Sequence, residues 1–206
     1  MPLALQLAVI NYLSTCILKY GNVFMNYSAN GVNMNLKEKI RTVPHWPIKG
    51  VMFRDITTLL QDARAFKETC DMLYHRYRDM QIEKVVAIDA RGFIFGAVLA
   101  YKLNVGFVPV RKAGKLPYKT ISESYTLEYG KSVVEMHIDA IQKGERVLVV
   151  DDLIATGGTI SAATKLVEKL EGEIVECVFI IELPDLNGKD KIKRYKAFTL
   201  TEFEGE

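Results

Sequence analysis

Four short apolar runs, separated by stretches with helical spacing, constrain the fold of this chain more than any other feature. The runs are residues 85–88, 106–112, 147–150 and 173–183. Apolar side chains recur at helical intervals after the first run and after the third, so strands and helices alternate along the chain. Strands joined through helices pair in parallel and are buried on both faces. The pattern predicts an α/β domain with a central, mostly parallel sheet flanked by helices.

Two helices are expected before the first of these strands. Residues 35–43 have apolar side chains at helical intervals, and Pro44 and Pro47 would end that helix because proline lacks a backbone N–H. Residues 62–80 again follow helical spacing, and Asp62 is expected to cap the helix. The turn-rich segment between the two leads into an extended piece.

Residues 112–136 interrupt the alternation of strands and helices. They are rich in Lys, Gly, Ser and Pro, and Tyr125, Leu127 and Tyr129 alternate with other residues before Gly130. This predicts a β-hairpin that projects from the sheet. Long insertions in compact domains are usually functional lids or disordered.

Composition excludes several classes of protein. The chain has 206 residues, which fits one domain, and its net charge of +2 is too balanced to indicate a nucleic-acid or membrane partner. Cys16, Cys70 and Cys177 form no CxxC pair, which predicts free thiols, a reducing cytoplasmic compartment and no zinc site. The three histidines are scattered, so no histidine-based metal site is expected.

Residues 1–33 differ from the rest of the chain. Residues 2–18 carry no charge, but polar side chains interrupt them, and they are too short for a membrane span. No basic residue precedes them, as a signal peptide would require. Because regular helical composition resumes at Met34, we expect residues 1–33 to be an extension, mobile or not native, and residues 34–206 to be the functional domain.

Two adjacent acids follow the third run, in the stretch VLVVDDLIATGGT from Val147 to Thr159. Ligands of open α/β sheets bind outside the carboxyl ends of the strands. Asp151 and Asp152 are therefore expected at a ligand site, where carboxylates accept hydrogen bonds from sugar hydroxyls.

Small residues and a helix follow the two acids. Glycine allows close approach to a ligand, and the free N–H groups of a turn and helix start suit a phosphate. The expected phosphate-binding residues are Ala155, Thr156, Gly157, Gly158 and Thr159. One continuous peptide would thus bind a ribose 5-phosphate. The alternative is an ordinary turn between strand and helix, with acids that only cap the helix.

The stretch 147–163 resembles the phosphoribosyl-pyrophosphate motif of the type I phosphoribosyltransferase family. The resemblance continues in the segments 50–60, 89–100, 107–120 and 125–141, in order and spacing, and covers about residues 35–206. It implies the type I phosphoribosyltransferase fold, with a small N-terminal hood at about 34–60 and a flexible lid hairpin at about 112–136.

The segments resemble the branch of the family that uses adenine. This implies transfer of the phosphoribosyl group of phosphoribosyl pyrophosphate to adenine, which gives AMP and pyrophosphate in purine salvage. Mg²⁺ would be held mainly by substrate and water, because it prefers substrate phosphates to a protein cage. By family habit the protein would be a cytoplasmic homodimer without nucleic-acid or membrane partners.

The resemblance also implies roles for basic residues. The turn from Ala90 to Gly92 would bind pyrophosphate and contain a non-proline cis peptide bond, with Arg91 as a catalytic residue. The other expected pyrophosphate ligands are Arg111, Lys112 and Lys115. Guanidinium and ammonium groups suit a polyanion, although Lys112 or Lys115 taken alone is more typical of an ordinary solvated surface residue.

For the base, the resemblance implies that backbone groups around Met52 and Arg54 read the edge of adenine while Phe53 stacks on the ring. Leu183 would pack on the other face. Glu128 would manage the proton of the base beneath the lid, and Tyr129 would help to seal it. The alternatives are a core position for Phe53 and a solvated hairpin position for Glu128.

Two other functions stay open at this point. The enzyme would use hypoxanthine, guanine or xanthine if its hood recognised a 6-oxopurine. A regulator that senses phosphoribosyl pyrophosphate would carry a nucleic-acid-binding module, but residues 1–33 contain only Lys19 as a basic residue.

Overall fold

The computed structural model describes residues 34–127 and 130–205. The expectations for residues 1–33, and those for Glu128 and Tyr129, therefore lie outside the described residues. No helix within the described ranges is both long and apolar enough to cross a membrane.

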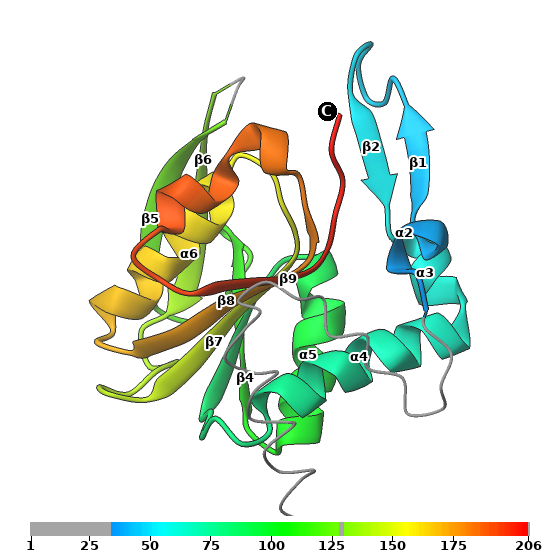
Figure 1. Ribbon diagram of the computed structural model, residues 1–206. Coiled ribbons are helices and arrows are strands. Elements are labelled where there is room, and N and C mark those ends of the chain that lie inside the picture. Colours follow the sequence, from blue (N-terminus) through cyan, green and yellow to red (C-terminus); the bar gives the residue numbers. More distant parts are fainter. Residues whose placement is uncertain (1–33, 128–129, 206) are drawn as a thin grey trace, which may run out of the picture. The chain divides into compact units, whose positions relative to one another are not determined.

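A seven-stranded sheet forms the centre of the domain (Figure 1), in the order β5-β6-β4-β3-β7-β8-β9. Neighbouring strands are parallel from β4 to β9, and the β5–β6 pair joins the β4 edge in antiparallel orientation. The mostly parallel sheet is confirmed. The strands are β3 (Lys84–Ile88), β4 (Gly106–Lys112), β5 (Thr120–Leu127), β6 (Gly130–His137), β7 (Arg146–Ile154), β8 (Glu173–Glu182) and β9 (Ala197–Glu202).

Two helices form the connections that matter for ligand binding. Helix α5 (Arg91–Leu103) leads from β3 to its neighbour β4, and α6 (Gly158–Lys169) leads from β7 to its neighbour β8 on the other side. Such crossovers are right-handed, and the two connections lead to opposite edges of the sheet. The helices therefore lie on opposite faces of the sheet, as Figure 1 shows. The strand order therefore reverses between β3 and β7, which is where ligands bind in such sheets.

The core consists of the apolar strands and the inner sides of both helices. Val149, Phe179 and Leu166 are fully buried. Helix α4 (Ala63–Tyr77) packs near α5, with the rings of Phe66 and Phe95 at 5.9 Å. Asp62 caps α4 as predicted, because its Oδ1 accepts the N–H groups of Arg64 and Ala65.

The first predicted helix is shorter than its apolar spacing indicated. Helix α2 covers only Leu36–Lys39, and β1 (Arg41–Pro44) pairs with β2 (Met52–Asp55) in antiparallel orientation. Two physical causes favour the strand. Thr42 and Val43 are β-branched, and Pro44 disfavours helical geometry in the residue before it.

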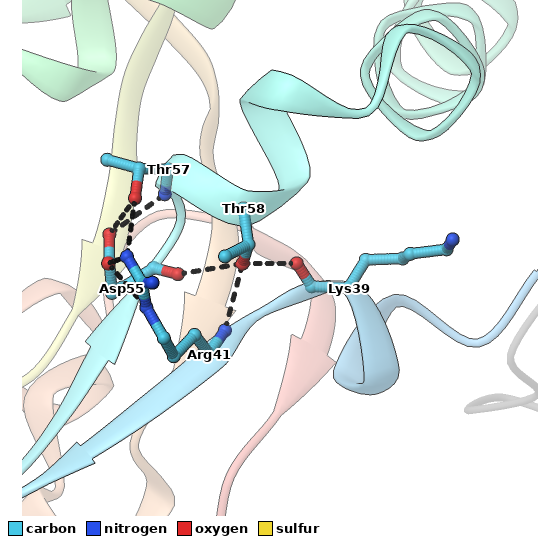
Figure 2. A network of polar contacts seen from close by, with 5 residues as sticks. All are labelled: Lys39, Arg41, Asp55, Thr57 and Thr58. Carbon is cyan, nitrogen blue, oxygen red and sulfur yellow. Dashed lines mark hydrogen bonds and ion pairs between the residues drawn. The ribbon is translucent and has the colours of Figure 1, made fainter.

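A polar network fastens this hairpin to α3 (Thr57–Gln61), and Figure 2 shows it. Asp55 accepts bonds from the Arg41 guanidinium and from both the hydroxyl and the backbone N–H of Thr57. Thr58 Oγ1 donates to the carbonyl of Lys39 at 2.7 Å and accepts the N–H of Arg41. The segment predicted as a hood, residues 34–60, is thus a compact hairpin with short helices.

The predicted hairpin in residues 112–136 is present as β5 and β6. Its lower part is held by α6, because Lys169 Nζ donates to the Ser122 carbonyl and pairs with Glu123 at 2.8 Å. The hairpin therefore continues the sheet at β4 and does not simply project from it.

Two strands of the seven-stranded sheet differ from the prediction. β7 does not end before the acids but runs on to Ile154, because Asp151 pairs with Phe179, and Leu153 with Ile181, on β8. The edge strand β9 was not expected.

Candidate functional site

The two acids and an arginine meet where the strand order reverses. Arg91 begins α5 directly after β3, and its Nε donates to Asp152 Oδ2 at 2.5 Å across the β3–β7 boundary. The Asp152 side chain is 5% exposed, whereas that of Arg91 is 46% exposed. The carboxylate is thus the fixed partner, and the guanidinium keeps a face toward solvent where it can meet an anion.

Asp151 is strongly affected by its surroundings. Burial, and then the charge of the adjacent Asp152, raise the pKa of Asp151 well above its ordinary value. Its Oδ1 accepts the backbone N–H of Asp152 at 2.9 Å. A carboxyl group that holds its proton can donate as well as accept a hydrogen bond, which suits a sugar hydroxyl.

The turn after β3 contains a non-proline cis peptide bond. This bond joins Asp89 to Ala90, so it lies directly before the turn from Ala90 to Gly92 in which a cis bond was expected. Arg111 Nε donates to Asp89 Oδ2 at 2.8 Å, and its Nη1 donates to the Lys115 carbonyl at 3.0 Å. The turns that follow β3 and β4 therefore hold each other.

Gly92 lets α5 approach β7 closely. A Cβ atom at this position would lie 2.9 Å from both Asp151 Oδ1 and the Val150 carbonyl oxygen. A larger residue would push the turn at Arg91 away from the acids. This turn therefore needs glycine for its packing against β7.

The turn at residues 155–158 is built on a backbone contact between two glycines. Gly157 has a φ of +72°, and a Cβ there would lie 2.2 Å from the Gly188 carbonyl oxygen. A Cβ on Gly188 would lie 2.1 Å from the Ala155 carbonyl oxygen. Gly158 and Thr159 then begin α6, whose first N–H groups have no intrahelical acceptor. The turn is thus held in a fixed shape with donors at its end.

The hood contributes an aromatic surface beside Arg91. The Arg91 guanidinium carbon lies 5.7 Å from the centroid of the Phe53 ring, and Trp46 contacts the same ring edge-on at 4.4 Å. Phe53 is only partly buried. Phe53 therefore lies beside Arg91 and is not one of the buried core residues.

Leu183 is anchored to the end of the β7 strand. Its backbone N–H donates to the Ile154 carbonyl at 3.0 Å, and its side chain is buried. This bond places the residue after β8 beside the turn that follows Asp152.

Not every predicted site residue gains a contact to this group. Lys112 is exposed and pairs with Val134 on β6, and Lys115 is exposed and joins only through its carbonyl oxygen. Met52 lies opposite Pro44 in the hood hairpin. Glu128 and Tyr129 are outside the described residues.

Two contributors to the site were missed from the sequence. Asp89 holds Arg111, and its position directly before Ala90 in the turn could have indicated a role. Gly188 acts only through packing against Ala155, in a segment with no motif, so no sequence signal points to it.

In the described part of the chain, no group of three or more His, Cys, Asp or Glu side chains is arranged to hold a metal ion. Asp151 and Asp152 lie near the carboxyl end of β7, beside the place where the strand order reverses. Mg²⁺ commonly uses one or two carboxylates together with substrate phosphates, so these two acids fit a cation carried by a phosphorylated substrate.

Known proteins are similar to this chain in both sequence and structure. Residues 55–205 match the model of the phosphoribosyl transferase domain. An adenine phosphoribosyltransferase of Desulfosudis oleivorans is 69% identical over 173 residues, which are 84% of this chain and 100% of the relative.

Solved structures of adenine phosphoribosyltransferases are also similar to this chain. The adenine phosphoribosyltransferase of Thermoanaerobacter pseudethanolicus has a TM-score of 0.78 at 49% identity, covering 81% of this chain and 97% of its own. The Saccharomyces cerevisiae enzyme, complexed with adenine and D-2,5-dideoxy-2,5-imino-altritol 1,6-bisphosphate, has a TM-score of 0.77 at 39% identity, covering 81% and 96%.

Proposed function

Because this chain belongs to the adenine phosphoribosyltransferases, within the phosphoribosyl transferase domain family, we propose how its own residues carry out the reaction. The reaction transfers the phosphoribosyl group of phosphoribosyl pyrophosphate to adenine and gives AMP and pyrophosphate, which salvages the free base. The observation that carries the residue assignment is the Arg91–Asp152 pair. It joins the expected pyrophosphate turn and the expected ribose-binding acids where the strand order reverses.

We propose that residues 151–159 bind the ribose 5-phosphate. The Asp151 and Asp152 carboxyl groups bind the ribose hydroxyls, and the phosphate accepts N–H groups of the turn from Ala155 to Thr159. The contact between Gly157 and Gly188 supports this role because it fixes the turn before ligand arrives. A site held in its bound shape loses less entropy on binding.

Departure of pyrophosphate leaves positive charge on the ribose, as in glycoside chemistry. We propose that Arg91 and Arg111 neutralise the leaving group, with the exposed Lys112 and Lys115 as additional cations. Asp89 supports this role by holding Arg111 in place. Fixed guanidinium groups stabilise developing negative charge without reorganisation. Mg²⁺ held by the substrate and water, beside Asp151 and Asp152, would supply further neutralisation of that charge.

The base is proposed to lie between Phe53 and Leu183. We call the space between these two residues the base position. Backbone groups of Met52 and Arg54 would read the edge of adenine, because an amino group donates where an oxo group accepts. Glu128 would accept the proton that the base loses on bond formation, and Tyr129 would exclude water. The partly buried Phe53 ring beside Arg91 supports the stacking role.

Compartment and assembly are part of the same proposal. Cys70 and Cys177 are free and buried, which supports a reducing compartment such as the cytoplasm. We propose a homodimer, as the resemblance implies. Light scattering on the purified protein tests this, and a monomer at assay concentrations would contradict it.

A product assay tests the function directly. The protein is incubated with phosphoribosyl pyrophosphate, Mg²⁺ and one of adenine, hypoxanthine, guanine or xanthine, and nucleotide formation is followed by chromatography. We expect AMP from adenine and at most trace product from the 6-oxopurines. Efficient product formation from hypoxanthine or guanine would contradict the assignment of the base.

A further inference from the structure

The C-terminal segment is fastened to the stretch that carries Leu183. Phe203 follows β9, and its backbone N–H donates to the Glu182 carbonyl at 2.9 Å, at the end of β8. Two residues further on, the N–H of Gly205 donates to Asp185 Oδ2 at 2.7 Å. The two bonds lie on either side of Leu183 along the chain, so residues 203–205 follow that stretch closely.

The side chain of Phe203 reaches the hood. The Arg54 guanidinium carbon lies 4.5 Å from the centroid of the Phe203 ring, and Lys37 Nζ lies 5.7 Å from it. Arg54 is only 8% exposed, and its Nη1 donates to Thr42 Oγ1 at 2.7 Å. An aromatic face attracts a cation, and more strongly when the pair is shielded from water. The ring therefore fixes β2 of the hood to the C-terminal segment.

The two sides of the base position belong to different parts of the domain. Phe53 lies on β2 of the hood, and Leu183 lies after β8 of the sheet. A planar base stacks well only when the surfaces on its two faces are held at the right separation. That separation depends on how the hood is attached to the sheet.

Phe203 contacts a residue adjacent in sequence to Phe53 and a residue adjacent in sequence to Leu183. Its ring contacts Arg54, next to Phe53, and its backbone binds Glu182, next to Leu183. We propose that Phe203 is a positioning residue for adenine, which holds hood and sheet at the separation that the base requires. This inference rests on the proposed function, because it needs the base to lie between Phe53 and Leu183.

The chain offers a matched control on the same strand. Phe198 lies on β9, and its ring lies 3.8 Å from the guanidinium carbon of Arg76, which belongs to α4 and not to the hood. Phe203→Leu and Phe198→Leu each remove an aromatic ring from an arginine and keep an apolar side chain. They differ in the part of the domain that loses its contact with the ring, which is the hood for Phe203→Leu and helix α4 for Phe198→Leu. Phe203→Tyr keeps the ring and serves as the rescue variant.

The experiment measures AMP formation with each substrate varied at saturation of the other. For Phe203→Leu we expect the KM for adenine to rise about tenfold, the factor that 1.4 kcal/mol produces, with the KM for phosphoribosyl pyrophosphate unchanged. Phe203→Tyr should match the parent. Phe198→Leu should lower the unfolding temperature but leave both KM values unchanged.

Several results would overturn the inference. One is a KM for adenine within twofold of the parent in Phe203→Leu. Others are an equal rise of both KM values, the same rise in Phe198→Leu, or a failure of Phe203→Tyr to restore the parent value. A parent protein that forms no AMP would instead refute the proposed function, and this inference with it, so the two failures are distinguishable.

Discussion

Replacement of Gly188 by alanine tests whether the turn proposed to bind the phosphate is held in shape by a residue outside that turn. The new Cβ would lie 2.1 Å from the Ala155 carbonyl oxygen and 2.9 Å from the Ile154 side chain. The carbonyl belongs to the backbone, so no side-chain rotation relieves the overlap. Ordinary contacts of a Cβ atom begin at 3.4 Å, and the turn must therefore move by roughly 1 Å.

The size of the expected effect follows from this displacement. A misplacement of about 1 Å can cost about 100-fold in rate, so kcat/KM for phosphoribosyl pyrophosphate should fall by about that factor. Forced overpacking also costs about 1–3 kcal/mol of stability. Steady-state AMP formation gives the first value, and urea denaturation gives the second.

A control glycine separates the close contact from a general effect of alanine. Gly106→Ala would place its Cβ 3.0 Å from the flexible side chain of Lys84, which can move aside. This variant should keep the activity of the parent. The reasoning would be refuted by a folded Gly188→Ala protein whose kcat/KM for phosphoribosyl pyrophosphate equals that of the parent.

Three further predictions concern acidic residues. Asp151→Asn combined with Asp152→Asn should abolish binding of phosphoribosyl pyrophosphate in calorimetry, whereas the exposed Asp79→Asn should not; normal affinity in the double variant would contradict the ribose assignment. The hydrogen bond from Thr57, and then that from Arg41, lower the pKa of Asp55 from 3.8 to about 2. Because the folded pKa lies below the unfolded one, the ionised carboxylate stabilises the fold above about pH 4, and this contribution is lost as the pH falls through 2. Asp55→Asn should therefore cost at most about 2 kcal/mol at pH 7 and progressively less below pH 4 in urea denaturation; a cost that does not change with pH would contradict the assignment. Glu128→Gln should lower kcat far more than it raises the KM for adenine, and equal losses would mean that its role is only to position the base.

The sequence predicted the sheet and most of the site because both depend on local patterns. The run 85–88, the turn after it and α5 follow from apolar periodicity and a short polar interruption. Asp151, Asp152 and the glycines after them follow one another along the chain. Ligands of such sheets bind at the carboxyl ends of the parallel strands. This rule alone is enough to predict that these residues lie close to Arg91.

Features that depend on distant packing could not be predicted in this way. The helical spacing of residues 35–43 is real, but pairing with β2 outweighs it from Arg41 onward. In β9, by contrast, Phe198 and Leu200 alternate with threonines, which is a local pattern typical of a strand. Gly188 has no signal at all, because its small size matters only for the backbone of Ala155.

The pair of Arg91 and Asp152 has a consequence for the end of each turnover. The buried Asp152 carboxylate already pairs with the Arg91 guanidinium. In the proposed role of Arg91, this carboxylate would compete with pyrophosphate for the guanidinium, and Arg91 would not remain an unbalanced charge when the product leaves. The residue proposed to assist departure of pyrophosphate would thereby also disfavour its rebinding and help to clear the site for the next substrate.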